Sequence, residues 1–124
     1  KEELPIVINK IKKMLVSNQI DIYYKSKEIS LNFSKILYIE KNGQYTHIVT
    51  VKNTYIVKHS MKYYEKRLSI KMFGYVSQGF LANYQYIESE NNQFVLMKNG
   101  HVSYYSRGRR KVFLDNYLKY ITLY

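Results

Sequence analysis

The alternation of apolar and polar residues between positions 19 and 59 constrains the fold of this chain more than any other feature. A period of two places successive side chains on opposite faces of a β-strand. The alternating apolar residues are Ile20, Ile22, Tyr24, Ile29, Leu31 and Phe33. Residues 46–52 and 54–58 are rich in β-branched side chains and are expected to pair across a tight turn at Lys52-Asn53. This half of the chain is therefore predicted to be β-structure.

Further apolar runs and turn signals extend the β-structure toward the C-terminus. Residues 36–40 form a more continuous apolar run. Strands are expected near residues 75–76, 84–88, 93–97 and 101–105, and Asn99-Gly100 is a strong hairpin signal between the last two. Propensity makes Asn42-Gly43 a turn dipeptide as well.

Three segments have helical spacing instead. Residues 4–16 repeat apolar side chains every three to four positions, and residues 110–120 regain that spacing near the C-terminus. In residues 60–69, Ser60 is a suitable N-cap for a short helix with Met61, Tyr64 and Leu68 on one face. We predict a mainly β domain over residues 18–124, preceded by a helix in residues 1–17. That helix is either a linker from a preceding domain or packs on its own domain.

The charge of the chain points to a polyanionic partner. Lys and Arg number 20 against 9 Asp and Glu, which gives a net charge of +11. No acid lies between Glu40 and Glu65, between Glu65 and Glu88, or between Glu90 and Asp115. One face of the fold is therefore expected to be nearly free of negative charge, as phosphate binding requires. The alternative is a basic protein whose charge serves only solubility.

Several function classes find no support in the sequence. The chain has no cysteine, so it has no disulfide or thiolate ligand, and this fits a reducing cytoplasm. Its histidines, His47, His59 and His101, stand singly and are expected on the surface rather than around a metal. No apolar run approaches the roughly 18 residues that cross a bilayer. We expect no enzyme activity, cofactor, metal or membrane contact, and a cytoplasmic location.

A run of basic residues follows the last predicted strand. Arg107, Arg109, Arg110 and Lys111 surround Gly108, which places four cations in five residues at the start of a predicted helix. Cations at that end oppose the helix dipole. Guanidinium groups suit phosphates and guanine edges, so a phosphate partner explains the run better than a solvated helix start does.

The chain contains 15 tyrosines, which are spread over several predicted strands rather than paired on one. Half-buried strand positions suit a ring that packs while its hydroxyl reaches water. The alternative use is base stacking on a sheet, as in single-stranded nucleic-acid binders.

Three segments, in order and at matching spacing, resemble the LytTR-type DNA-binding domain of bacterial response regulators. Residues 36–40 (ILYIE) look like the family's strand "DI-x-YIEA". Residues 73–83 look like its segment "F-x-R-x-H-R-S-Y-x-V-N", with Phe73, Phe80 and Asn83 in step. Gly100 with Ser106-Arg107 looks like its closing hairpin. The resemblance covers residues 19–121 and implies an elongated stack of small antiparallel β-sheets with short helices and a C-terminal helix.

In that family, loops rather than a recognition helix enter the major groove of double-stranded DNA. By resemblance, the region around Asn42-Gly43 is an exposed loop. The DNA-facing residues carried over to this chain, with the adjoining basic run, are Asn42, Gln44, Tyr45, Thr46, Ser77, Gln78, Arg107, Gly108, Arg109, Arg110 and Lys111. The chain has Tyr75 in place of the motif's Arg, Ser77 in place of its His and Gly79 in place of its Ser. Glutamine at Gln78 suits adenine, and the basic run supplies phosphate affinity.

The expected function is sequence-specific double-stranded DNA binding by the output domain of a bacterial transcription regulator. The resemblance allows repeated promoter half-sites, a homodimer on DNA and an upstream receiver or sensor domain. Two alternatives remain open at this point: a protein-interaction or regulatory module that has lost base readout, and an RNA or single-strand binder.

Overall fold

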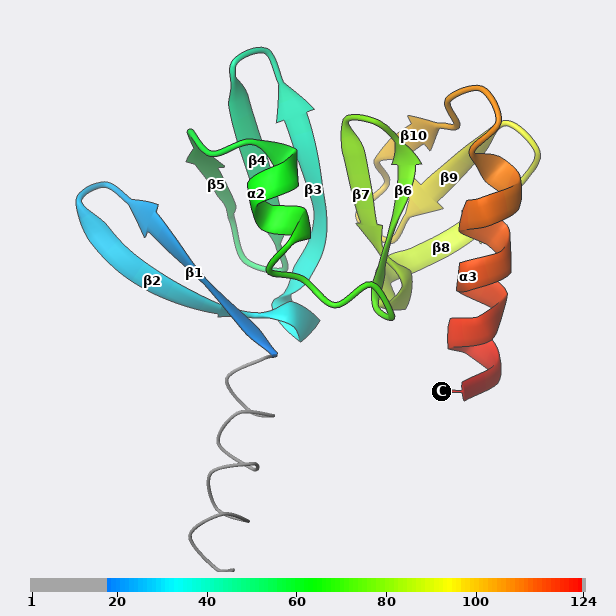
Figure 1. Cartoon of the computed structure of the whole chain (residues 1–124), viewed down its shortest axis with the longest axis horizontal. Coiled ribbons are helices and arrows are strands. Elements are labelled where there is room, and N and C mark those ends of the chain that lie inside the picture. Colours follow the sequence, from blue (N-terminus) through cyan, green and yellow to red (C-terminus); the bar gives the residue numbers. More distant parts are fainter. Residues whose placement is uncertain (1–17, 124) are drawn as a thin grey trace, which may run out of the picture.

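The computed structural model describes residues 18–123, which form a row of three antiparallel sheets (Figure 1). The helix expected over residues 4–16, and with it the linker assigned to residues 1–17, lies outside the described residues. The first sheet pairs β1 (Gln19–Tyr24) with β2 (Lys27–Asn32). The elongated stack expected from the sequence is confirmed.

The central sheet has five strands in the order β5-β4-β3-β7-β6. Its strands are β3 (Ile36–Asn42), β4 (Tyr45–Thr50), β5 (Thr54–Val57), β6 (Phe73–Ser77) and β7 (Phe80–Asn83). The third sheet has the order β10-β9-β8 and consists of β8 (Ile87–Glu90), β9 (Phe94–Met97) and β10 (Val102–Tyr104). The predicted hairpins at Lys52-Asn53 and Asn99-Gly100 are both present.

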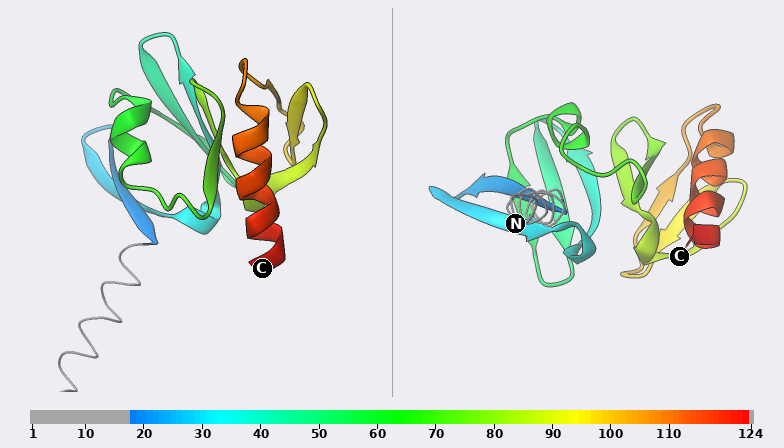
Figure 2. Two further views of the ribbon diagram at one scale, coloured as in Figure 1. Left: turned by 45° about the vertical axis from the view of Figure 1, so that its right-hand side comes forward. Right: turned by 60° about the horizontal axis from the view of Figure 1, so that its bottom comes forward.

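Two α-helices accompany the sheets in the described part of the chain. Helix α2 (Met61–Glu65) begins as predicted, because the Ser60 side chain accepts a hydrogen bond from the Tyr63 amide, but it ends earlier than residue 69. Its apolar residues Met61 and Tyr64 are buried against the central sheet. Helix α3 (Arg110–Leu123) lies at the other end of the row, beside the third sheet (Figure 2).

The structure differs from prediction between residues 80 and 88. Strand β7 was not expected, and Tyr84–Tyr86 is a short 3-10 helix (η2) rather than the start of a strand. All four residues of β7 are buried, so the strand lacks the alternation that identifies a one-sided strand. The turn to η2 follows from Asn83, whose side chain accepts a hydrogen bond from the Gln85 amide and caps the helix.

Asn83 also ties η2 to a second 3-10 helix, η1 (Phe33–Lys35). The Asn83 side chain is fully buried, and its Nδ2 donates to the carbonyl oxygens of Phe33 at 3.1 Å and Ile36 at 2.8 Å. One amide side chain thus satisfies three backbone groups at the junction of β3 and β7. The family motif residue at this position therefore has a structural role.

Two hydrophobic clusters lie on opposite faces of the central sheet. One lies between that sheet, the β1–β2 hairpin and α2, and the other lies among β6, β7, the third sheet and α3. Strand β3 contributes to both clusters: Ile36 and Ile39 belong to the first, and Leu37 and Tyr38 to the second. Alternation places successive residues of β3 on opposite faces, and the register shift between Ile36 and Tyr38 lets the adjacent Leu37 and Tyr38 both face the second cluster. This double burial fixes the position of β3, the strand that carries the first candidate loop.

Candidate nucleic-acid interface

Two tight hairpin turns lie at the same end of the central sheet. Asn42 pairs with Tyr45 across Gly43-Gln44, and Ser77 pairs with Phe80 across Gln78-Gly79. Because β3 and β7 are antiparallel neighbours, the end of β3 lies next to the start of β7. The Lys41 amide donates to the Gly79 carbonyl at 2.8 Å, which joins the two turns directly. Both turns lie along the upper edge of Figure 1.

The first of these turns corrects one detail of the sequence reading. The segment at Asn42-Gly43 was expected to be part of an exposed loop rather than a turn. It is a two-residue hairpin turn, in which Gly43 adopts a φ of +63°. The turn residues are Gly43 and Gln44, and glycine at the first of these positions adopts such a φ without steric cost.

The loop between β10 and α3 lies beside the second turn. The Ser106 amide donates to the Val76 carbonyl at 3.1 Å, one residue before the end of β6. Gly108 has a φ of +79°, and the Arg109 amide closes the turn by donating to the Ser106 carbonyl at 3.1 Å. The three loops predicted to face DNA are therefore neighbours at one edge of the molecule.

Most of the predicted contact residues are accessible at this edge. The exposed ones are Asn42, Gln44, Tyr45, Gln78, Arg107, Gly108 and Lys111, whereas Ser77 and Arg109 are half-buried. The Tyr45 ring retains 40% exposure at the tip of the first hairpin.

Thr46 is placed differently. Its side chain is only 3% exposed, and its Oγ1 donates to the His59 carbonyl at 2.6 Å. Side chains alternate along β4, so a residue next to the exposed Tyr45 points to the opposite face. Thr46 therefore fixes the end of β5 against β4 instead of facing outward.

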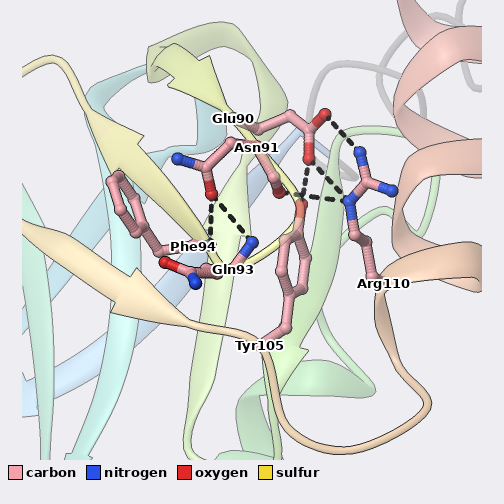
Figure 3. A network of polar contacts seen from close by, with 6 residues as sticks. All are labelled: Glu90, Asn91, Gln93, Phe94, Tyr105 and Arg110. Carbon is pink, nitrogen blue, oxygen red and sulfur yellow. Dashed lines mark hydrogen bonds and ion pairs between the residues drawn. The ribbon is translucent and has the colours of Figure 1, made fainter.

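Arg110 also has an internal partner (Figure 3). Its Nη2 lies 3.1 Å from Glu90 Oε1, and its Nε lies 3.3 Å from Glu90 Oε2 and 3.1 Å from the Asn91 carbonyl oxygen. Tyr105 donates to the same carboxylate at 2.8 Å. Burial and the neighbouring Glu90 raise the pKa of the Tyr105 hydroxyl. Arg110 thus anchors the start of α3 to the end of β8, and one of the four cations of the basic run is already neutralised.

Two other acids near the loops have side-chain partners. Glu40 Oε2 lies 3.1 Å from Nε2 of His101, whose ring stacks on Tyr38 and Phe80. Burial raises the pKa of Tyr75, as do the charge and hydrogen bond of Glu65. The negative charges nearest the loops are therefore engaged within the fold.

A hollow of about 750 Å³ lies between the first two turns and the start of α2. Lys41, Lys58 and Lys62 line it together with Arg109. No sequence motif contains these three lysines. The signal that points to them is the absence of any acid between Glu40 and Glu65, a stretch that contains all three.

Other kinds of site are not found in the described residues. Within residues 18–123, no three His, Asp or Glu side chains group closely enough to hold a metal ion. None of the helices there is long and apolar enough to cross a membrane.

Comparison with known families identifies the domain. The family model of the LytTr DNA-binding domain matches residues 26–117. The chain belongs to this family. A search of solved structures found the LytTr DNA-binding domain of a Bacillus cereus protein described as a methyl-accepting/DNA response regulator. The two chains are 20% identical in sequence, and their structures superpose with a TM-score of 0.68. The match covers 80% of this chain and 95% of that chain. The comparison with curated proteins found no match.

The family match confirms the resemblance deduced from the three sequence segments. The similarity in structure confirms the expected fold class, because the matched LytTr domain has the same architecture.

Proposed function

We propose that this LytTr domain binds double-stranded DNA in a sequence-specific manner, as the output domain of a bacterial transcription regulator. The observation that supports this best is the meeting of the three loops at one edge of the molecule, joined by the backbone contacts Lys41–Gly79 and Ser106–Val76. Loops that are fixed to one another can enter a groove without losing much conformational freedom on binding. The net charge of +11 adds the phosphate attraction that duplex binding needs.

The loop residues divide by chemistry into base readers and backbone contacts. Gln78, at the tip of the second turn, presents an amide that suits the N6 and N7 edge of adenine. Arg107, exposed in the third loop, suits the O6 and N7 edge of guanine. Asn42, Gln44, Tyr45 and Ser77 supply further polar contacts, and Arg109 and Lys111 supply charge for phosphates. Thr46 and Arg110 support the loops from within.

The relative and the family support a regulatory role for this domain. The similar Bacillus cereus domain belongs to a protein described as a response regulator. We propose that an upstream receiver or sensor domain controls this domain in the bacterial cytoplasm. Binding as a homodimer to repeated half-sites would double the number of groove contacts.

The distribution of the tyrosines argues against single-strand binding. Tyr38, Tyr64 and Tyr84 are buried in the core, where no base can stack on them. The most exposed rings, Tyr23, Tyr45 and Tyr104, lie on three different sheets. A stacking platform needs neighbouring rings on one surface. The interaction-module alternative is separated from DNA binding by the experiment below.

The test is a binding selection on genomic DNA fragments, followed by titration of the selected duplex at several salt concentrations. With six to eight phosphate contacts, the log–log slope of affinity against salt should be about −5 to −7. The matched controls are a scrambled duplex and each isolated strand as competitor. A flat salt titration, or equal affinity for all duplexes, contradicts the proposal. Efficient competition by single strands would favour the single-strand alternative.

A further inference from the structure

The hollow beside the first two turns has a concentration of positive charge without a matching acid. We call it the basic hollow and define it by Lys41, Lys58, His59, Lys62 and Arg109. The three lysines are exposed, and within residues 18–123 none of them forms an ion pair. Glu65 is the one acid that lines the hollow, and burial together with the charge of Glu65 raises the pKa of Tyr75, which lines the hollow beside it. Like charges held close together repel one another, so such an arrangement favours an anionic ligand.

The walls of the basic hollow are fixed by the fold. The Thr46 hydroxyl holds the His59 carbonyl, the Ser60 hydroxyl accepts from the Tyr63 amide at 3.2 Å, and the Lys41 amide binds Gly79. These bonds fix the backbone directly after Lys58 and on both sides of Lys62. The lysine side chains themselves are free to adjust to a ligand.

His59 and Tyr63 strengthen the wall formed by α2. The two rings stack with centroids 3.8 Å apart and an angle of 9° between their planes. The guanidinium carbon of Arg67 lies 3.6 Å from the Tyr63 centroid. Stacking of a cation on an aromatic ring stabilises both groups, so the ring of His59 is held in place at the edge of the hollow.

The third loop reaches the basic hollow through Arg109. Its guanidinium carbon lies 5.3 Å from the centroid of the Tyr75 ring, in cation–π contact. Tyr75 stands where the family motif has an arginine. Its ring therefore holds Arg109 beside the second turn, whose residues Gln78 and Gly79 line the same hollow. A cation from the third loop takes the place of the one absent from β6.

We propose that the basic hollow is a phosphate-binding site that holds the backbone of one DNA strand between the first and second loops. Lys58 and Lys62 contact phosphates from α2, Lys41 from β3, and Arg109 from the third loop. This assignment rests on the proposed function and extends the contact surface beyond the three loops. Lysine binds phosphate as a point charge and reads no base, so the site contributes affinity rather than specificity.

The test compares two double variants of the whole chain with the same change in charge. Lys58→Gln with Lys62→Gln removes two cations from the hollow. Lys52→Gln with Lys119→Gln is the matched control, because Lys52 lies in the β4–β5 turn and Lys119 on α3, and both are exposed. Thermal melting confirms that each variant is folded. Affinity for selected and scrambled duplex is then titrated against salt.

The hollow variant should weaken both duplexes by the same factor, roughly tenfold per lysine at 0.1 M salt, and reduce the magnitude of the salt slope by about two. The salt slope of the control variant should differ from that of the wild type by no more than about 0.5. If the hollow variant binds duplex with the wild-type salt slope, the basic hollow is not a phosphate-binding site, although the domain still binds DNA. If the wild-type domain binds no duplex at all, the proposed function itself fails, and the assignment fails with it.

A second measurement identifies the source of the phosphate. Inorganic phosphate is titrated into the wild-type domain and into the hollow variant by NMR, with the amides of His59 and Met61 as reporters. Weak binding of phosphate together with the loss of duplex affinity supports a site for the DNA backbone. If the hollow variant loses phosphate binding but retains wild-type duplex affinity, the hollow serves a free phosphorylated ligand and the assignment is overturned.

Discussion

The Arg110 guanidinium pairs with the Glu90 carboxylate through two nitrogen–oxygen contacts of 3.1 and 3.3 Å. The contact joins the first residue of α3 to the last residue of β8. It places a negative charge at the N-terminal end of the helix, where the helix dipole favours one. Arg110 therefore contributes to the orientation of α3 and of the third loop.

Replacement of Arg110 should affect stability more than DNA binding. Arg110→Ala should lower the free energy of unfolding by about 1 kcal/mol, a modest value because the side chain is partly exposed and screened by solvent. Lys111→Ala, the neighbouring control, should leave stability unchanged and reduce the magnitude of the salt slope of duplex binding by about one. Urea denaturation and salt titration measure the two effects. If Arg110→Ala instead left stability unchanged and reduced the salt slope by about one, Arg110 would contact phosphate in the complex.

The sequence predicts the parts of the fold that depend on neighbouring residues. The period of two in β1 and β2, the Ser60 cap and the Asn99-Gly100 turn are local signals, and all are found. Strand β7 escaped prediction because both of its faces are buried, so its sequence lacks a period. On one side it pairs with residues 38–40, which lie 40 or more positions earlier in the chain.

The candidate site was predictable in outline but not in its partners. The family segments identify the three loops, yet neither motif nor charge reveals that Arg110 pairs with a residue 20 positions away. Nor do they show that Thr46 points inward, which depends on the register of β4 against β5. The basic hollow forms where α2 lies next to the first two turns. Its lysines come from separate elements, so the sequence alone does not show that they lie together.

Asn83 should be among the most sensitive residues of the domain. Asn83→Ala leaves the buried Ile36 carbonyl and the part-buried Gln85 amide without this partner and removes one of two hydrogen bonds to the Phe33 carbonyl, at a cost of about 3 kcal/mol. The control Asn32→Ala removes a similar cap from the exposed start of η1 and should cost about 1 kcal/mol or less. Denaturant unfolding of both variants provides the comparison. If both variants lost the same free energy of unfolding, the two buried hydrogen bonds from Asn83 Nδ2 would contribute little to stability.

Tyr84 should make the domain sensitive to alkaline pH. Burial raises the pKa of Tyr84 to about 12, against about 10 in an unfolded chain. The stability gained by keeping the hydroxyl neutral is therefore complete below pH 10 and is lost as the pH rises toward 12. The loss should be about 1 kcal/mol per pH unit in that range.

Tyr84→Phe isolates this effect. In the described structure the buried Tyr84 hydroxyl has no hydrogen-bond partner and lies against Gly74, so its removal should be neutral or stabilise the domain by up to about 1 kcal/mol at pH 7. The variant should also lose less stability between pH 10 and 11 than the wild type. Urea unfolding at pH 7, 10 and 11 measures both quantities. A large loss at pH 7 would reveal a bound water or another partner for the hydroxyl.

Gln78 tests whether the second turn reads bases. It is exposed at the tip of the β6–β7 hairpin, and the bond between the Lys41 amide and the Gly79 carbonyl holds that tip in place. Gln78→Ala should weaken the selected duplex by about 1–3 kcal/mol and relax the preference at one base pair, while scrambled duplex is bound as before. Gln85→Ala is the matched control, because Gln85 is another exposed glutamine and lies on η2, away from the three loops. Its affinity and its base preference should match those of the wild type.

Competition with a set of duplexes changed at single positions locates the base pair that Gln78 reads. A uniform loss on selected and scrambled duplex would make Gln78 a backbone contact, and base readout would then rest on the first and third loops.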